Sequence, residues 1–243
     1  MGRSRSECVP SSNRVFRAFD TSRMAAPRGT LVCDGSSDQL LRPLLRWLCA
    51  QHGQPEVEIE WANLYSLPER PPTLRERIER AVDLYPCDVV FIHRDAERQG
   101  YDRRASEIDS AIQGLSLPAS IPVVPVRMTE AWLLSNEGAI RFAAGNPAGQ
   151  VPLGLPPPAQ LENTPDPKAV LHQALRVAAE LSVRRRRRLR THQAAHVVAE
   201  RTEDFTPLRV LAAFRALESR VANLMGRWDS AAERFGEDDA HAG

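Results

Sequence analysis

Between residues 30 and 135, short continuous runs of apolar residues alternate with stretches in which apolar residues recur every three or four positions. The continuous run at 88–93 is typical of a strand buried on both faces of a parallel sheet, and further strands are predicted at 30–33, 57–64 and 121–128. The helical spacing predicts helices at 36–52, 73–85, 102–113 and 130–135. This order predicts an α/β fold with an open, mostly parallel sheet and helices on both faces. Pro122 and Pro125 favour the beginning of a strand or an edge strand for the last of these runs.

Four further segments flank the predicted α/β domain, which is assigned to residues 29–145. Residues 1–28 are rich in Ser and Arg and have no apolar period, which predicts a disordered N-terminal extension. Prolines crowd residues 146–167 and predict a linker. Helical spacing returns over 168–225 and predicts a helical region, and the last residues, 226–243, are expected to fray.

The length and composition of the chain limit the classes of protein to which it can belong. A chain of 243 residues with 42% hydrophobic residues can bury a substantial core, and its apolar runs are far shorter than the roughly 20 residues of a membrane span. A net charge of +1 gives no global field, so any attraction to a polyanion must be local. The four cysteines form no CxxC pair and no apolar leader follows the N-terminal arginines, so a reducing, cytoplasmic location is expected. Met1 and Met24 are both candidate translation starts.

Several common catalytic motifs are missing from the sequence. It has no GxGxxG, no GxxxxGK[ST], no GxSxG and no zinc-ligand spacing. These absences argue against dinucleotide-binding enzymes, P-loop NTPases and serine hydrolases.

Acidic residues follow three of the four predicted strands. They are Asp34 and Asp38 after the first strand, Asp95 and Glu97 after the third, and Glu130 after the fourth. Because ligands of open α/β sheets bind beyond the carboxyl ends of the strands, we expect these carboxylates to converge. Each close pair of like charges costs about 4 kcal/mol at an intermediate dielectric constant, and a divalent cation removes that cost. Mg²⁺ suits such a site because it binds one or two carboxylates together with waters and substrate phosphates.

Each of these residues also has a structural interpretation. Asp34, with a glycine and two serines after it, is typical of a turn and helix cap. Asp95 and Glu97 suit a solvated loop in which neighbouring arginines pair with them, and Glu130 favours a helix N-terminus through the helix dipole. His93, at the end of a buried strand, is a ligand, a general base or a core histidine.

A block of arginines in the helical region predicts local attraction to nucleic acid. The block consists of Arg184, Arg185, Arg186, Arg187, Arg188 and Arg190. With Arg176 and Lys168, which is the one lysine of the chain, it sets eight cations against the single acid Glu180 over residues 168–190. Such a cluster neutralises phosphates and makes affinity steeply salt-dependent. It also suits a solvated helix junction or a face for an acidic protein, and no aromatic residues interleave with it for base stacking.

The segments after the first, third and fourth strands together resemble the toprim fold, the metal-binding module of topoisomerases, bacterial primases and overcoming-lysogenization-defect nucleases. In toprim domains a glutamate and a glycine end the first strand, a further acid follows, and an Asp-x-Asp pair ends the third strand. Asp-Gly-Ser-Ser-Asp at 34–38 and His-Arg-Asp at 93–95 look like these motifs. Asp34 replaces the glutamate, and His93 replaces the first aspartate. The layout over residues 30–135 is more similar to a toprim-like family of uncharacterised bacterial proteins, in which an Arg-x-x-Glu-Ala-Trp segment recurs, as at 127–132.

The resemblance implies Mg²⁺- or Mn²⁺-dependent cleavage or rejoining of phosphodiester bonds. Strand passage by a topoisomerase needs a nucleophilic tyrosine on another domain, and a primase needs modules that this chain is too short to house. The resemblance therefore implies a small nuclease of phage defence or DNA processing. It would act on DNA more readily than on RNA, with an ATPase as a candidate partner subunit.

The sequence leaves three hypotheses open. In the first, a Mg²⁺-dependent toprim-like nuclease binds its metal ion through Asp34, Asp95 and Glu130 and nucleic acid through the arginine block. Its catalysis is assisted by Asp38, Glu97 and His93. In the second, a non-catalytic toprim-like module binds nucleic acid or a partner protein, which the substitutions at positions 34 and 93 favour. In the third, the sheet is receiver-like, although the lysine expected after a fifth strand is missing.

Overall fold

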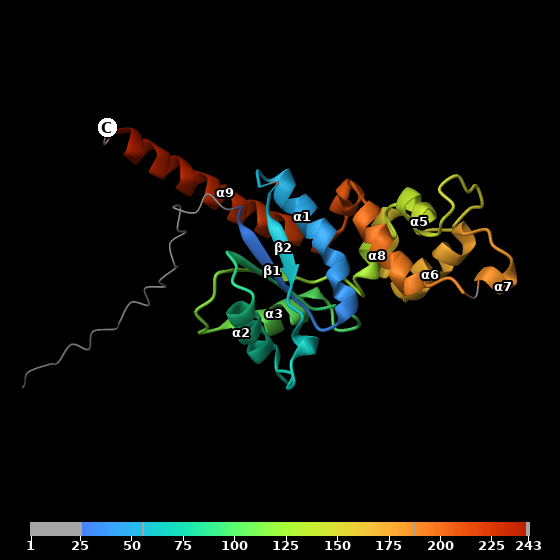
Figure 1. Ribbon diagram of the computed structural model, residues 1–243, viewed down its shortest axis with the longest axis horizontal. Coiled ribbons are helices and arrows are strands. Elements are labelled where there is room, and N and C mark those ends of the chain that lie inside the picture. Colours follow the sequence, from blue (N-terminus) through green and yellow to red (C-terminus); the bar gives the residue numbers. More distant parts are fainter. Residues whose placement is uncertain (1–25, 55, 187, 242–243) are drawn as a thin grey trace, which may run out of the picture.

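The computed structural model describes residues 26–54, 56–186 and 188–241 (Figure 1). Arg187 and the predicted N-terminal extension up to residue 25 therefore lie outside the described residues. Four strands form one parallel sheet in the order β2-β1-β3-β4. They are β1 (Arg28–Val32), β2 (Glu58–Trp61), β3 (Val89–His93) and β4 (Ala119–Val123). The predicted α/β fold is confirmed, and β4, which contains Pro122, lies at an edge of this sheet.

Helices cover both faces of the sheet, because alternate residues of each strand point to opposite sides. In β3, Val89 and Phe91 belong to one hydrophobic cluster, whereas Val90 and Ile92 belong to the other. The first cluster includes leucines of α1 (Arg42–Gln51) and the apolar face of α9 (Ala212–His241). The second includes residues of α2 (Leu74–Leu84) and α3 (Tyr101–Ile112). Burial on both faces explains why β3 is a continuous apolar run in the sequence.

The helix predicted at 36–52 is divided into two parts. Residues Ser36–Leu41 form the 3₁₀ helix η1, and the α-helix α1 begins only at Arg42. Pro43 lies in the first turn of α1, where its missing N–H costs nothing. An α-helix that began at Ser36 would place the Pro43 ring against a carbonyl of the preceding turn, so the earlier residues adopt the tighter helix.

The remaining helices follow the sheet in the sequence. They are α4 (Glu130–Leu133), α5 (Glu137–Ala143), α6 (Pro167–Ala178), α7 (Val183–Arg186) and α8 (Thr191–Arg201), with 3₁₀ turns η2 (Leu64–Ser66), η3 (Pro158–Asn163) and η4 (Thr206–Val210). The predicted C-terminal helical region is thus confirmed. Within the proline-rich segment 146–167, Leu161 of η3 is fully buried. Among the described helices, none is long and apolar enough to cross a bilayer.

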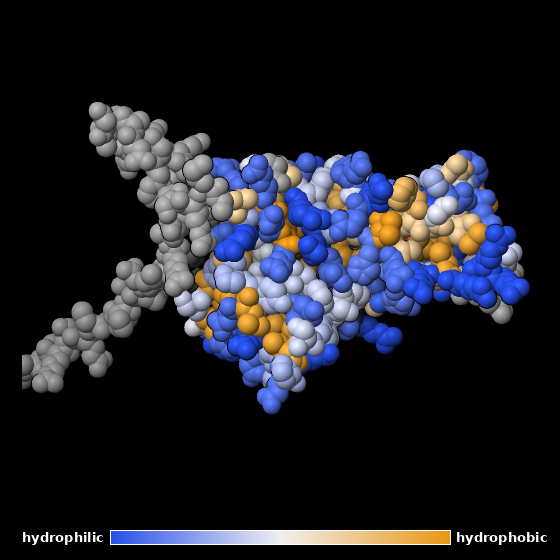
Figure 2. Space-filling view, in the orientation of Figure 1, coloured by the Kyte–Doolittle hydropathy of each residue, from blue (hydrophilic) through white to orange (hydrophobic). Residues whose placement is uncertain are grey.

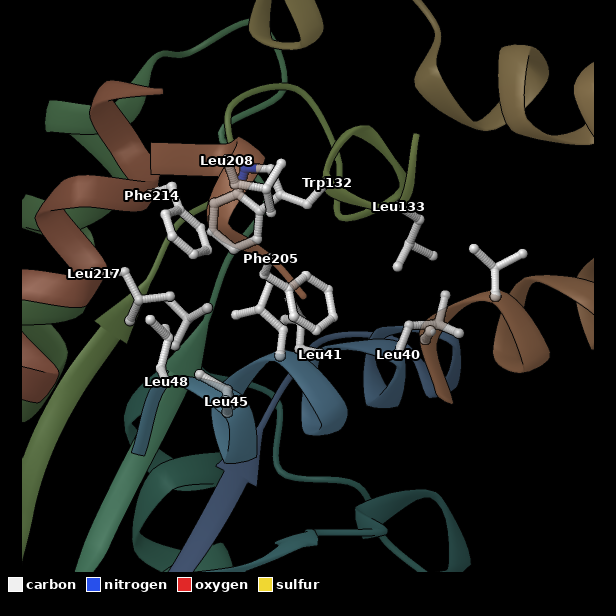
Figure 3. Close-up of a cluster of buried hydrophobic side chains, with 14 of the residues drawn as sticks. Leu40, Leu41, Leu45, Leu48, Trp132, Leu133, Phe205, Leu208, Phe214 and Leu217 are labelled. Atoms are coloured by element: carbon white, nitrogen blue, oxygen red, sulfur yellow. The ribbon is translucent and has the colours of Figure 1, made fainter. Parts of the chain in front are cut away.

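The sheet and the helical region share one hydrophobic core, with Trp132 at its centre (Figure 3). Trp132 is fully buried, and its ring meets Phe214 of α9 edge to face, with 5.7 Å between the ring centroids. Phe205 meets Trp47 of α1 in a similar T-shaped pair at 5.8 Å. Each such pair contributes about 1 kcal/mol beyond the area it buries. The core therefore holds α4, α9 and α1 in a fixed arrangement against the sheet.

The strand order reverses at β1. From β1 the chain passes to β2 on one side, and it then returns to β3 on the other side of β1. In open α/β sheets, ligands bind beyond the carboxyl ends of the strands at such a switch point. The turns that follow β1 and β3 are therefore where the fold itself places a site.

Candidate functional site

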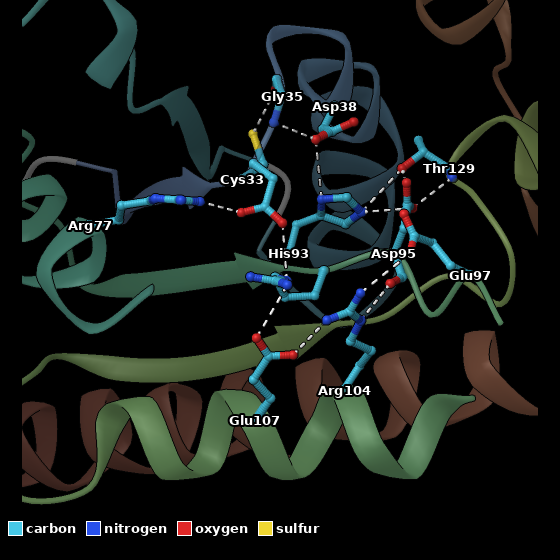
Figure 4. Close-up of polar contacts among 12 residues, drawn as sticks. Cys33, Gly35, Asp38, Arg77, His93, Asp95, Glu97, Arg104, Glu107 and Thr129 are labelled. Carbon is cyan, nitrogen blue, oxygen red and sulfur yellow. Dashed lines mark hydrogen bonds and ion pairs between the residues drawn. The ribbon is translucent and has the colours of Figure 1, made fainter. Parts of the chain in front are cut away.

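The turns after β1 and β3 bring three of the predicted acids to one edge of the sheet (Figure 4). Asp34 and Asp38 come from the turn after β1 and from η1, and Asp95 comes from the turn after β3. His93 links Asp38 to Asp95, and Asp34 forms an ion pair with Arg94, the residue between His93 and Asp95 in the sequence. The expectation that the acids gather is therefore met for these three residues, and Glu97, which pairs with Arg104, joins them in what we call the acidic cluster.

His93 lies at the centre of this cluster, between Asp38 and Asp95 (Figure 4). Its side chain is 1% exposed. Its Nδ1 is 3.5 Å from Asp38 Oδ2, and its Nε2 is 3.2 Å from both Asp95 Oδ1 and Thr129 Oγ1. Burial by itself lowers the pKa of His93, but the hydrogen bonds and charges of the two aspartates outweigh it and raise the pKa to about 9. At neutral pH the ring is therefore a buried cation between two carboxylates.

Asp38 is held on its other side by backbone and hydroxyl groups. Its Oδ2 accepts a hydrogen bond from the Gly35 amide at 2.9 Å, and its Oδ1 accepts one from the Ser37 hydroxyl at 3.3 Å. Burial raises the pKa of Asp38, but the hydrogen bond and charge of His93, with the Gly35 and Ser37 contacts, lower it overall. The carboxylate is thus ionised at neutral pH and caps the start of η1.

Asp95 is fixed by the turn that follows β4. Its Oδ1 accepts hydrogen bonds from the Thr129 amide at 3.0 Å and from the Thr129 hydroxyl at 3.4 Å. The same turns are joined by the Glu97 amide, which donates to the Arg127 carbonyl at 3.0 Å. Glu97 and Arg127 both have positive φ, at 48° and 72°, although neither is a glycine. Such backbone costs on the order of 1 kcal/mol or more per residue and persists where the surrounding contacts fix it.

Arginines neutralise the outer acids of the cluster. Asp34 forms ion pairs with Arg77 and with Arg94, whose Nε lies 3.0 Å from Asp34 Oδ2. Arg94 also pairs with Glu107 at 3.1 Å, and Glu107 pairs in turn with Arg104 at 2.7 Å. Acidic and basic groups therefore alternate along the edge of the sheet.

Glu97 and Arg104 complete the cluster. Arg104 Nη2 lies 3.4 Å from Glu97 Oε2, so this arginine pairs with an acid of the loop, as the structural interpretation of the loop expects. The Glu97 side chain is nevertheless 59% exposed. It is the most accessible carboxylate of the cluster.

Glu130 is buried and faces another part of the chain. It is 5% exposed, and its Oε1 lies 3.1 Å from Lys168 Nζ in the first turn of α6. Sequence reasoning named Glu130 but missed this partner. No local sequence signal pairs the two residues, because the contact depends on how α6 packs against α4.

The carboxylates of the predicted ligands are compared with what a divalent cation requires. Carboxylate oxygens are the ligands that Mg²⁺ and Mn²⁺ prefer. In the described part of the chain, however, no group of three His, Cys, Asp or Glu residues is arranged to hold a metal ion. Each predicted ligand already faces a cation of the protein: Asp34 faces two arginines, Asp95 faces His93, and Glu130 faces Lys168. In this arrangement the residues do not fit a resident cation.

The arginine block lies apart from the acidic cluster. Figure 1 places α7 at the end of the molecule farthest from α2 and α3, and Figure 2 shows hydrophilic side chains gathered over that end. Arg184, Arg185, Arg188 and Arg190 are exposed. Of the other two predicted residues, Arg186 is described by its backbone in α7, and Arg187 lies outside the described residues. The structure therefore brings the acids together but not the acids and the arginines.

Comparison with known proteins identified no relatives. The chain matches no family model, no curated protein and no solved structure. The toprim resemblance thus rests on the motifs at 34–38, 93–95 and 127–132 alone.

Proposed function

We propose that this protein is a toprim-like module that binds the phosphodiester backbone of nucleic acid, with DNA as the expected partner, and holds no resident cation in its acidic cluster. The observation that carries the proposal is the arginine block. Arg184, Arg185, Arg188 and Arg190 are exposed, and none of them forms an ion pair with another described residue. Their charge is available to phosphates, and the release of counterions from the nucleic acid then supplies the affinity.

The acidic cluster is compatible with nucleic-acid binding because its carboxylates are paired with cations of the protein. Free carboxylates at the carboxyl edge of the sheet would repel a polyanion. Here His93 neutralises Asp38 and Asp95 in part, and arginines neutralise Asp34 and its neighbours. Because the cancelling charges lie within about 4 Å of each other, their field falls off quickly outside the protein. A nucleic acid held by the arginine block therefore meets little repulsion from this edge.

A second candidate is the Mg²⁺- or Mn²⁺-dependent nuclease that the resemblance implies. One observation favours it: Asp34, Asp38 and Asp95 follow β1 and β3 at the switch point of the sheet, beside two turns that contain residues with positive φ. This function requires that Arg77 and Arg94 leave Asp34 when metal ion and substrate bind. A role in phage defence, a cytoplasmic location and an ATPase partner remain predictions of the sequence.

A salt series of binding measurements tests the first proposal. The affinity for a short DNA duplex is measured by fluorescence anisotropy at several salt concentrations. The parent is compared with the triple variant Arg184→Gln, Arg185→Gln, Arg188→Gln and with a matched control, Arg80→Gln, Arg220→Gln, Arg227→Gln, which removes three exposed arginines elsewhere. The slope of log affinity against log salt should fall by about 3 in the first triple variant and remain unchanged in the control. Equal slopes in parent and block variant would overturn the proposal.

The second candidate is tested in parallel with the same protein. Mg²⁺ and Mn²⁺ are titrated calorimetrically, and supercoiled, linear and single-stranded DNA and RNA are incubated with each metal. Cleavage that requires metal and disappears in Asp95→Asn would establish the nuclease. DNA binding without metal-dependent heat or cleavage would support the binding module.

A further inference from the structure

A small cavity opens at the carboxyl end of β1, beside the acidic cluster. Its volume is about 80 Å³, and its walls include Asp34, Tyr65, Arg70 and Arg77. The buried residues Cys33 and Leu64 also line it, with 8% and 7% of their surfaces exposed. The cavity thus has room for a small group such as a phosphate.

The charges around this cavity favour an anion. Arg77 is paired with Asp34 and also donates to the carbonyls of Pro71 and Pro72, so its charge is largely cancelled. Arg70 forms no ion pair with another described residue. Its guanidinium lies 4.0 Å from the centre of the Tyr65 ring. The cavity wall therefore carries a net charge of about one positive unit, on a side chain that is exposed and free to turn toward a ligand.

An aromatic ring, that of Tyr65, lines the same cavity. Tyr65 lies 6.4 Å from Trp61, the last residue of β2, and the two ring planes are inclined by 35°. The Tyr65 hydroxyl donates to the Asp34 carbonyl, which fixes the ring beside the cavity. The flat Arg70 guanidinium covers one face of this ring, and that face becomes open to a nucleobase when Arg70 turns toward a phosphate. This pair lies far from the arginine block, around which the sequence shows no aromatic residues.

We propose that the cavity receives the phosphorylated end of a nucleic-acid strand, with the terminal phosphate against Arg70 and Arg77 and the adjacent base on Tyr65. This inference deepens the proposed function and rests on it. A terminal phosphate monoester carries nearly two negative charges at neutral pH, against one for an internal diester. The net positive charge of the cavity wall therefore attracts a terminal phosphate more strongly than an internal one. The pocket adds a local contact to the long-range attraction of the arginine block.

The experiment compares short single-stranded oligonucleotides that differ in their ends. Each is fluorescently labelled at the opposite end and carries a 5′-phosphate, a 3′-phosphate or free hydroxyls. The parent protein should bind one phosphorylated form about tenfold more tightly than the hydroxyl form, the size expected for one charge-assisted contact. The form that binds more tightly identifies which end enters the cavity. Equal affinities for all three oligonucleotides would overturn the inference.

Two variants of the cavity and one control variant separate the phosphate contact from base stacking. Arg70→Gln should abolish the preference for a phosphorylated end, and Tyr65→Ala should weaken binding of all three oligonucleotides about tenfold through loss of stacking. Arg80→Gln, an exposed arginine of α2 outside the cavity, should change neither quantity. Circular dichroism and the unfolding midpoint establish that each variant is folded. An end preference that persists in Arg70→Gln would contradict the assignment of the phosphate contact.

The two proposals fail in different ways. If the arginine-block variant loses its salt-dependent duplex binding while the parent does not distinguish phosphate from hydroxyl ends, the proposed function stands and the pocket inference falls. If the parent prefers phosphorylated ends and the block variant binds duplex normally, the pocket stands and the arginine block loses its role.

Discussion

The acidic cluster at the edge of the sheet and the arginine block of the helical region use charge in opposite ways. In the cluster, Asp38 and Asp95 are paired within the chain, and His93 between them is almost completely buried. In the block, Arg184, Arg185, Arg188 and Arg190 are exposed and form no ion pairs among the described residues. The first arrangement fixes the conformation of three turns, whereas the second leaves charge free to attract a partner.

This contrast shows why a high local density of charge is not by itself a sign of function. A buried pair contributes through the cost of losing either partner, because the remaining charge is then left without compensation in a medium of low dielectric constant. An exposed cluster of like charges contributes little to folding but extends its field over about a Debye length. Variants of the two regions should therefore affect different measurements.

The largest effect on stability is expected from His93→Leu. This change leaves the Asp38 carboxylate, which is 9% exposed, without its cationic partner. The free energy of unfolding, measured in urea, should fall by about 3–5 kcal/mol. Asp38→Asn should then cost less in the His93→Leu background than in the parent, by about 1–3 kcal/mol. If the effects of the two substitutions on the free energy of unfolding are additive, the contact between His93 and Asp38 does not stabilise the protein. Should His93→Leu fail to fold, His93→Gln keeps one donor and allows the same comparison.

The second-largest effect is expected in the pH dependence of the free energy of unfolding. The folded-state pKa of His93, about 9, lies above its ordinary value of 6.5. The stabilisation by the charged ring is therefore fully present below pH 6.5, and it is lost as the pH rises through 9. The free energy of unfolding should fall by about 3 kcal/mol over this range. His93→Leu should lack this fall, and a flat profile in the parent would contradict the pairing. At the acid end, the lowered pKa of Asp38 predicts a separate loss of stability as the pH falls below its ordinary value of 3.8.

The fold followed from the sequence where local patterns determine it. The continuous run at β3 and the helical spacing of α2 were sufficient to predict these elements. The predicted start of the helix at residue 73 matches the structure, in which the Thr73 hydroxyl caps α2 by accepting a hydrogen bond from the Glu76 amide. The division of the helix at 36–52 was missed, although Pro43 carried the signal. Periodicity reports which face is buried, but it does not distinguish a 3₁₀ helix from an α-helix over six residues.

The site followed from the sequence only in part. Position after a parallel strand predicted that Asp34 and Asp95 would lie at one edge, because topology alone determines it. The partners of these acids could not be predicted in the same way. Arg77 reaches Asp34 from α2, and its reach depends on how that helix packs on the sheet. The positive φ of Glu97 likewise has no local sequence signal, since this conformation is held by contacts from another turn.

Lys168→Met should have an intermediate effect. The variant removes the partner of buried Glu130, but Lys168 itself is 32% exposed, so water replaces part of the lost interaction. We expect the free energy of unfolding to fall by about 2 kcal/mol. Adding Glu130→Gln should recover most of this loss, because the neutral side chain no longer needs a cation. If Lys168→Met leaves the free energy of unfolding unchanged in urea denaturation, the ion pair does not help to join α6 to α4.

The smallest effect on stability is expected from the arginine block. In the triple variant Arg184→Gln, Arg185→Gln, Arg188→Gln, the free energy of unfolding should change by less than about 0.5 kcal/mol, because these side chains are exposed and form no ion pairs among the described residues. The change should be an increase, since neutral side chains relieve like-charge repulsion, and high salt should remove it by screening. A loss of more than about 1 kcal/mol in urea denaturation would mean that the block pairs with acids in the folded protein. Its charge would then be used within the chain, as in the acidic cluster, and the argument that it is free to attract nucleic acid would fail.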